Sequence, residues 1–179
     1  MRGMLTLPDL LSQHPGEGRV DGIWLRPARD APAVAVHAVR ALAGRGLDGD
    51  RAAARTSRQA GGSRRQVTLF QAEHLAPLAA WLGRPAIDPG VLRRNLVIAG
   101  LNLLAARSPL RGLELLLHIG EEVLLEVTGP CDPCSKMERE LGAGAYNALR
   151  GHGGVTARVL TDGEIRVGDR VWIDVARAR

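Results

Sequence analysis

The sequence predicts a mainly β protein with a few helices, a β-rich α+β fold built as a barrel or sandwich. Several short apolar runs alternate in hydrophobicity and are separated by turns rich in Gly and Asp, which is typical of antiparallel strands. Only two or three segments have helical spacing, and no βαβ rhythm runs along the chain. With 179 residues, of which 45% are apolar, the chain is long enough to bury a substantial core in one domain.

Residues 1–18 carry a short amphipathic piece that ends at Pro15-Gly16, and we expect a flexible or docking arm. Residues 19–175 are predicted to form the single domain. Strands are predicted over residues 19–25, 33–39, 66–70, 92–99, 113–119, 123–127, 155–160 and 170–175. Helices are predicted over residues 71–82, just after Cys134, and as a turn within 142–150. The segment between the last two strands is read as two turns.

The charge balance favours a small anionic ligand. The chain has 24 basic and 19 acidic residues, a formal net charge of +5, and only 3% aromatic residues. Stacking of single-stranded bases needs clustered aromatic side chains beside basic ones, and here the aromatic residues are scattered. A basic nucleic-acid-binding barrel therefore stays only as an alternative, held by net charge alone.

The cysteine count and the hydropathy limit the cellular setting. Two cysteines are too few for a disulfide framework or a four-thiolate zinc site. No stretch approaches the length of a membrane span, and residues 1–18 lack the apolar run of a signal peptide. We therefore expect a cytoplasmic protein with reduced thiols and no membrane partner.

Residues 44–65 form a long polar stretch that is rich in Gly and Arg. Its turn formers predict a loop rather than core, and a loop of this length inside a compact domain is usually functional or disordered. Two interpretations stay open. The loop is either a solvated basic surface or a cradle in which glycine amides and arginine side chains bind a phosphate.

The segment Cys131-Asp132-Pro133-Cys134 holds both cysteines and lies between a predicted strand and a predicted helix. A C-x-x-C pair can be half of a zinc site, a redox dithiol, two buried apolar residues, or one active thiol beside a spectator. A thiol at the start of a helix is activated, because the helix N-terminus stabilises the thiolate. We favour Cys134 as the single reactive thiol, able to ligate a soft metal or to carry sulfur.

Two further candidates are polar residues at loop–strand junctions. Arg93-Arg94-Asn95 is either surface charge or an anion site with two guanidinium groups and an amide. His152, which lies among glycines, is either a general acid or a loop residue. No Ser/His/Asp order, P-loop or dinucleotide fingerprint is present.

Five short motifs follow one another along the chain, and their order is more specific for a protein family than any single motif. They are Gly46-Leu47-Asp48-Gly49-Asp50-Arg51, Arg65-Gln66-Val67-Thr68-Leu69, Arg93-Arg94-Asn95-Leu96-Val97, Gly129-Pro130-Cys131-Asp132-Pro133-Cys134, and Gly153-Gly154-Val155 with Ile165-Arg166-Val167-Gly168-Asp169. Together they resemble the MOSC domain of molybdenum cofactor sulfurases, amidoxime-reducing components and small free-standing bacterial proteins. The resemblance spans about residues 19–175.

The resemblance implies a MOSC-like β-barrel that binds a molybdenum cofactor, a molybdenum ion held by a pterin. It implies that Cys134 is the catalytic thiol and metal ligand. The cofactor-binding residues that it implies are Arg64, Arg65, Arg93, Arg94, Asn95, Asp132 and Pro133. It also brings a family-level association with pyridoxal phosphate. Cys131 departs from the pattern and is an additional thiol.

Two activities are consistent with this resemblance. The first is an oxidoreductase that reduces N-hydroxylated compounds at molybdenum, with electrons from a separate flavin or iron–sulfur partner. The second is a sulfur carrier that takes a persulfide from a cysteine desulfurase onto Cys134.

Overall fold

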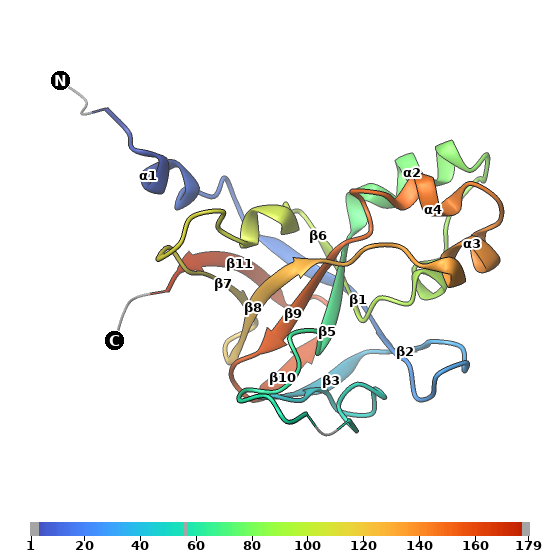
Figure 1. Cartoon of the computed structure of the whole chain (residues 1–179), viewed down its shortest axis with the longest axis horizontal. Coiled ribbons are helices and arrows are strands. Elements are labelled where there is room, and N and C mark those ends of the chain that lie inside the picture. The colour runs from blue at the N-terminus through green and yellow to red at the C-terminus, as the bar shows by residue number, and fades with distance from the viewer. Residues whose placement is uncertain (1–3, 56, 177–179) are drawn as a thin grey trace.

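The computed structural model describes residues 4–55 and 57–176, and seven of its strands close into a barrel (Figure 1). In order around the barrel the strands are β1 (Gly18–Leu25), β6 (Leu96–Ala99), β5 (Val67–Gln71), β9 (Val155–Val159), β8 (Val123–Pro130), β7 (Leu115–Ile119) and β11 (Arg170–Val175), which pairs with β1. All neighbours are antiparallel except β5 and β6, which are parallel. The expected β-rich barrel is confirmed.

Four shorter strands complete the sheets. Strands β11 and β2 (Val34–Val36) pair with the same edge of β1, β11 at its start and β2 at its end. The others form a three-stranded sheet with the order β10 (Gly163–Arg166), β3 (Ala38–Leu42) and β4 (Gly46–Leu47). This small sheet lies at the lower end of the barrel in Figure 1.

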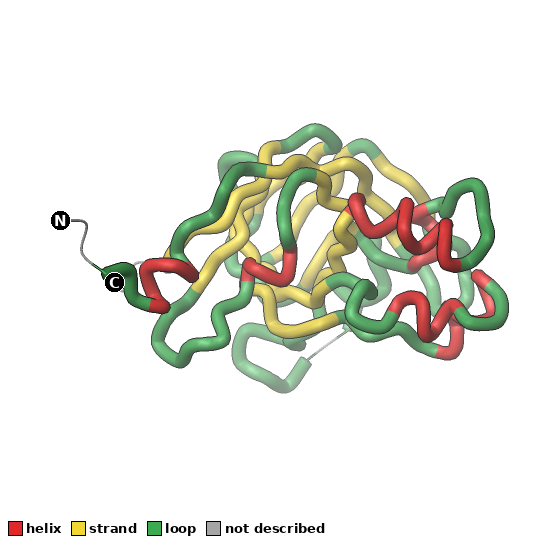
Figure 2. The backbone as a smooth tube through the Cα atoms, turned by 90° about the horizontal axis from the view of Figure 1, so that it is seen from above, coloured by secondary structure: helices red, strands yellow, loops and turns green. Residues whose placement is uncertain are grey.

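Most of the helices gather at one side of the barrel, whereas the first α-helix and the last 3-10 helix lie apart from them (Figures 1 and 2). The α-helices are α1 (Leu7–Leu11), α2 (Leu75–Trp81), α3 (Ser135–Leu141) and α4 (Ala145–Leu149), and the 3-10 helices are η1 (Ala72–His74), η2 (Pro89–Leu92) and η3 (Leu103–Ala106). Helix α1 projects from the far side of the barrel. Among the described residues, none of the helices is long and apolar enough to cross a membrane.

Alternation along β5 and β6 separates two apolar cores. Leu69 and Leu96 point into the barrel, where they join its interior, whereas Phe70 and Val97 point outward and pack under α2, α3 and α4. Successive side chains of a strand face opposite sides, and here both sides are covered. This explains why residues 96–99 read as an unbroken apolar run.

The structure corrects two local predictions and refines two others. The predicted strand over 33–39 is two strands in different sheets, because the chain bends at His37 and changes partners. Residues 163–166, read as a linker, form β10, a strand too short to show a clear period. The predicted helix over 71–82 is present, and its first turn is the 3-10 helix η1. One βαβ unit does exist, because parallel β5 and β6 need a crossover, and α2 lies within it.

Candidate functional site

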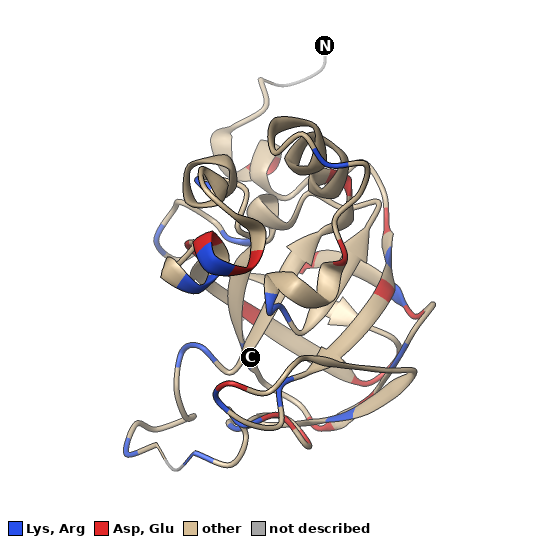
Figure 3. Cartoon of the chain, turned by 90° about the vertical axis from the view of Figure 1, so that its right-hand side faces the viewer, with Lys and Arg blue, Asp and Glu red and all other residues tan. Residues whose placement is uncertain are grey.

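A basic pocket of about 690 Å³ lies between the segment that holds the thiols and the loops that follow β1 and β4. Eight cationic side chains line it: Arg26, Arg29, Arg51, Arg55, Arg65, Arg93, Arg94 and Lys136. Asp132 is the one carboxylate among the lining residues. Figure 3 shows Lys and Arg positions along the long loops below the helices. The pocket is within the size range of small-molecule sites.

The two thiols line this pocket but differ in exposure. Cys134 is exposed and is the N-cap residue of α3, whereas Cys131 is buried. The Cys131 N–H donates to the Gly154 carbonyl at 2.8 Å, so this residue continues the barrel wall beyond β8. Cys134 instead sits at the positive end of a helix, where negative charge is stabilised.

Arg94 holds the thiol segment from beneath. Its guanidinium donates to the carbonyls of Gly153 at 2.7 Å, Leu92 at 3.0 Å and Cys131 at 3.1 Å. Burial lowers the pKa of Arg94, and electrostatic interaction with the nearby Cys131 and Cys134 opposes that shift. An arginine side chain stays protonated under such conditions. Arg94 is therefore a buried clamp between β6, the thiol segment and the loop before β9.

The loop that meets this clamp has room only for glycine. A Cβ added to Gly153 would lie 2.3 Å from the Cys131 carbonyl oxygen. No side chain fits at that distance, so Gly153 allows the loop to approach the thiol segment closely.

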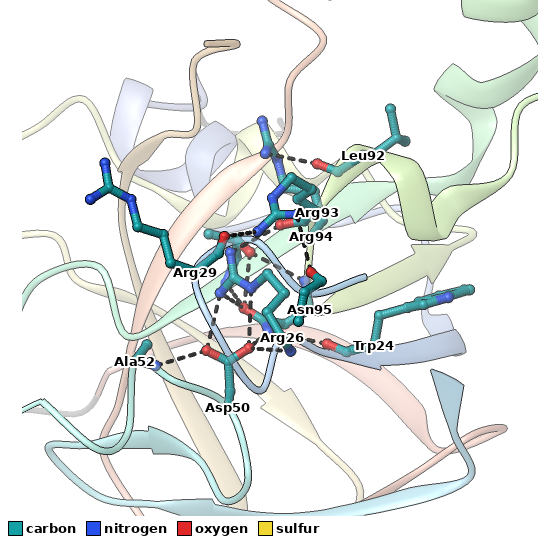
Figure 4. Close-up of polar contacts among 11 residues, drawn as sticks. Trp24, Arg26, Arg29, Asp50, Ala52, Leu92, Arg93, Arg94 and Asn95 are labelled. Carbon is teal, nitrogen blue, oxygen red and sulfur yellow. Dashed lines mark hydrogen bonds and ion pairs between the residues drawn. The ribbon is translucent and has the colours of Figure 1, made fainter. Parts of the chain in front are cut away.

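Asn95 lies under the pocket floor and uses its whole amide within the protein (Figure 4). Its Nδ2 donates to Asp50 Oδ2 at 2.7 Å and to the Trp24 carbonyl at 3.1 Å. Its Oδ1 accepts from Thr68 Oγ1 and from Arg26 Nη2, each at 2.9 Å. Asn95 thus joins β1, β5, β6 and the loop after β4 at one point.

Asp50 neutralises Arg26 in the same network. The carboxylate is 2% exposed and accepts from the Arg26 backbone N–H at 3.0 Å and from its Nε at 3.1 Å. Burial acts to raise the pKa of Asp50, but the hydrogen bonds from Arg26 and Ala52 outweigh it and the pKa is lowered. The pair is a buried ion pair whose members have further hydrogen bonds, as such pairs require.

Arg93 turns the chain between these groups. Its φ of 57° is the one positive value at a non-glycine position among the described residues. The Arg93 carbonyl accepts a hydrogen bond from Arg26 Nη1 at 3.0 Å. The Arg93 side chain donates from Nη2 to the Arg29 carbonyl at 2.8 Å. The left-handed conformation costs about 1–2 kcal/mol, and these contacts hold it. Consequently Arg93 and Arg94 bind different segments of the chain.

Other lining arginines have no carboxylate partner. Within residues 4–55 and 57–176, no ion pair involves Arg29, Arg51, Arg55 or Arg65. The Arg51 Nε atom is buried and has no hydrogen-bond partner among these residues. Burial, followed by the charges of Arg26 and Arg55, lowers the pKa of Arg51. An anion in the pocket would relieve both the unpaired donor and the charge repulsion.

The predicted site residues fall into four groups. Cys134, Asp132, Arg65, Arg93 and Arg94 line the pocket, whereas Asn95 lies beneath it. Pro133 is buried beside the thiols without lining the pocket. Arg64 lines a different cavity and contacts the Thr128 carbonyl at 3.5 Å.

The structure does not support His152 as a general acid in the pocket or the C-x-x-C pair as part of a zinc site. His152 does not line the pocket; it packs on His74 and Trp81, with ring centroids 4.9 and 5.2 Å away. Within the described part of the chain, no three His, Cys, Asp or Glu side chains are placed to hold a metal ion together. The C-x-x-C pair therefore finds no second half for a zinc site there.

Four residues of the site were not singled out from the sequence: Arg26, Arg29, Asp50 and Lys136. Arg51 lies within the stretch 44–65, for which a phosphate cradle was one of two interpretations. Asp50 and Arg51 end the first of the five ordered motifs, and that placement was the available signal. Lys136 Nζ donates to Asp30 Oδ1 at 2.7 Å and so ties α3 to the loop after β1. No local pattern marks Arg26, because its partners are Asp50 and Asn95, far along the chain.

Residues 56–172 match the sequence profile of the MOSC domain. The chain belongs to the MOSC domain family. Strand β1, which precedes the matched residues, supplies the seventh strand of this MOSC barrel. No curated protein sequence matches the chain.

Solved structures share the fold. The YuaD protein from Bacillus subtilis superimposes with a TM-score of 0.71 at 18% identity, covering 90% of this chain and 98% of its own. YiiM from Geobacillus stearothermophilus gives 0.63 at 19% identity, with 89% and 75% covered. YiiM from Escherichia coli gives 0.63 at 18% identity, with 92% and 72% covered. These likenesses establish the barrel architecture.

Proposed function

We propose that this MOSC domain binds a pterin-based molybdenum cofactor in the basic pocket, with Cys134 as the metal ligand. The observation that carries the proposal is the exposed Cys134 thiol in the same pocket as arginines without carboxylate partners. A soft thiolate suits a molybdenum centre, and guanidinium groups suit the phosphate of a pterin. The unpartnered buried Arg51 Nε is a further donor that such an anion would satisfy.

The residues have distinct roles in this proposal. Arg29, Arg51, Arg65 and Arg93 would bind the phosphate, and Asp132 and Pro133 shape the approach to the thiol. Arg94 and Asn95 would not need to touch the cofactor, because their polar atoms already hold the surrounding segments in place. When bound, the cofactor would supply two-electron redox chemistry at the metal.

The oxidoreductase activity that we propose is reduction of an N-hydroxylated compound. Cleavage of the N–O bond consumes two electrons and two protons and releases water. The electrons would come from a separate flavin or iron–sulfur protein, since the sequence shows no binding motif for either group.

Metal analysis tests the cofactor proposal. The chain would be expressed in a host that makes molybdenum cofactor, and molybdenum would be measured per protein. We expect near-stoichiometric metal in the wild type and in Cys131→Ala, and loss of metal in Cys134→Ala. Thermal unfolding would confirm that both variants fold. Folded wild-type protein without molybdenum from that host would refute the proposal.

A second candidate function is sulfur transfer, favoured by the presence of Cys131 in the same pocket as Cys134. The Cys134 thiolate would attack the terminal sulfur of a desulfurase persulfide, forming a Cys134 persulfide and releasing the donor thiolate. Intact mass spectrometry distinguishes the two candidates, since a persulfide adds one sulfur atom. Such an adduct on Cys134 without molybdenum would favour the sulfur carrier.

A further inference from the structure

A second depression of about 430 Å³ adjoins the thiol pocket on the side of the loop after β4. Its lining includes Arg45, Arg55, Arg58 and Arg65, and no carboxylate lines it. Arg55 and Arg65, together with Ser63, also line the thiol pocket. The two depressions therefore share a wall that carries two guanidinium groups.

The shape of the second depression is set by local contacts. A Cβ added to Gly62 would lie 1.8 Å from the Gly44 carbonyl oxygen, so the two loops meet closely only because residue 62 is glycine. Gln66 Nε2 donates to the Gly61 carbonyl at 2.8 Å, and the Arg65 N–H donates to Ser63 Oγ at 3.1 Å. The turn that carries Arg65 is therefore held before any ligand arrives.

The charges exceed what one phosphate group needs. In the described residues, no carboxylate pairs with Arg55, Arg58 or Arg65. Three such cations near one another repel, and a single phosphate in the thiol pocket would leave Arg58 without an anion. It would also leave Arg45 without one, although Arg45 Nε and Nη2 donate to the Ala53 carbonyl at 3.3 and 3.2 Å. A second phosphate, joined to the first across the shared wall, would meet all of them.

The thiol pocket and the second depression together form one groove. We infer that this groove has two adjoining anion subsites and takes a ligand with two linked phosphate groups, such as a diphosphate ester of a nucleotide. The subsite beside Cys134 binds one phosphate, and the subsite lined by Arg45 and Arg58 binds the other. The inference extends the proposed function by specifying the form of the ligand. It does not depend on the metal, because phosphate recognition at either subsite needs no thiol.

Calorimetry of the full chain tests the inference with inorganic phosphate, inorganic pyrophosphate and ADP as probes at constant ionic strength. We expect pyrophosphate and ADP to bind about tenfold more tightly than phosphate, the gain from one more charge-assisted contact. Arg58→Gln should remove that advantage while the Kd for phosphate stays within about twofold. Arg29→Gln, which changes the thiol pocket alone, should weaken all three probes.

Arg111→Gln is the matched control, since Arg111 is exposed and lines neither depression. Equal affinities for phosphate and pyrophosphate would overturn the inference, as would an Arg58→Gln effect no larger than that of the control. Tighter binding of a single-stranded oligonucleotide than of ADP would also overturn it, and would assign the groove to nucleic acid.

Cys134→Ala separates this inference from the proposed function. The variant should keep the preference for pyrophosphate. A chain that prefers pyrophosphate but never acquires molybdenum refutes only the proposed function. A chain that acquires molybdenum but shows no such preference refutes only the two-subsite inference.

Discussion

Two sets of polar residues meet at the pocket and differ in how their charges are satisfied. The buried polar network, formed by Arg26, Asp50, Thr68 and Asn95, pairs its charges and amides within the protein. The groove wall, formed by Arg29, Arg51, Arg55 and Arg65, has no carboxylate partner in the described residues. The first set determines the shape of the site, and the second determines what the site attracts.

Solvation explains this division. A largely buried guanidinium loses most of its hydration, so Arg26 needs the Asp50 carboxylate as a compensating partner. Arg29, Arg55 and Arg65 are exposed at the pocket, so they keep their hydration and can stay unpaired until an anion displaces the water. The Arg51 Nε differs, because it is buried and has no hydrogen-bond partner among the described residues. Substitutions in the network should therefore change folding, whereas substitutions in the wall should change binding.

The largest expected effect is on the network. Asp50→Ala leaves the Arg26 charge and the Asn95 amide buried without their acceptor, which should cost about 3–5 kcal/mol of unfolding free energy. Urea unfolding followed by circular dichroism measures it. Asp30→Ala is the matched control, because Asp30 pairs with Lys136 at the surface and should change stability little. Equal losses of unfolding free energy in Asp50→Ala and Asp30→Ala would contradict the distinction between the buried network and surface ion pairs.

Arg94→Gln should have the next largest effect, because it removes the clamp on the thiol segment. Loss of charge-assisted hydrogen bonds to the Gly153 and Cys131 carbonyls should cost about 1.5–3 kcal/mol. Because Cys131 is then less firmly held, its thiol should react faster with a thiol reagent. Arg139→Gln is the control, because Arg139 is exposed on α3, and unchanged Cys131 reactivity in Arg94→Gln would argue against a clamp.

Acid should weaken the network in a way that Asp50→Asn removes. The pKa of Asp50 is lowered in the folded state, so the carboxylate contributes stability that is fully present above the unfolded value of about 3.9. That contribution is lost as pH falls from about 4 through the lower native pKa. The free energy of unfolding, measured from pH 3 to 7, should fall less steeply in Asp50→Asn. If the unfolding free energy of the wild type and of Asp50→Asn fell in parallel with pH, Asp50 would not be the source of the acid sensitivity.

The smallest effect on stability is expected at the groove wall. Arg29→Gln should change the unfolding free energy by less than about 0.5 kcal/mol, as is usual for surface substitutions. The same variant should lower affinity for inorganic phosphate, because it removes one cation from the pocket. Calorimetry and urea unfolding on the same preparation would show both results. A large loss of stability would place Arg29 in the network instead.

Much of the architecture could be predicted because its signals are local. Alternation of apolar residues and Gly–Asp turns located six of the seven barrel strands near their observed bounds, and β6 within a longer predicted segment. The position of Cys134 at the start of a helix was also predictable, since Pro133 precedes a short run with helical spacing. Strand β10 and the break at His37 were not, because each depends on which sheet the chain joins.

The polar site shows the limit of local signals most clearly. Arg64 and Arg65 are neighbours in the sequence, yet one contacts Thr128 and the other lines the thiol pocket, because the chain turns before β5 begins at Val67. Arg93, Arg94 and Asn95 likewise read as one anion-binding motif, but they contact separate parts of the fold.

The sequence by itself determined the barrel class, the family and the position of Cys134 at the start of a helix, because periodicity and short motifs are properties of nearby residues. Only the tertiary structure decided which arginines are neutralised. Asp50 reaches Arg26 and Asn95 from 24 and 45 residues away, and pairing over such distances follows from barrel closure rather than from spacing. A charge in the sequence is a structural partner when the fold buries it beside a carboxylate, and is free to bind a ligand when the fold leaves it at the pocket wall.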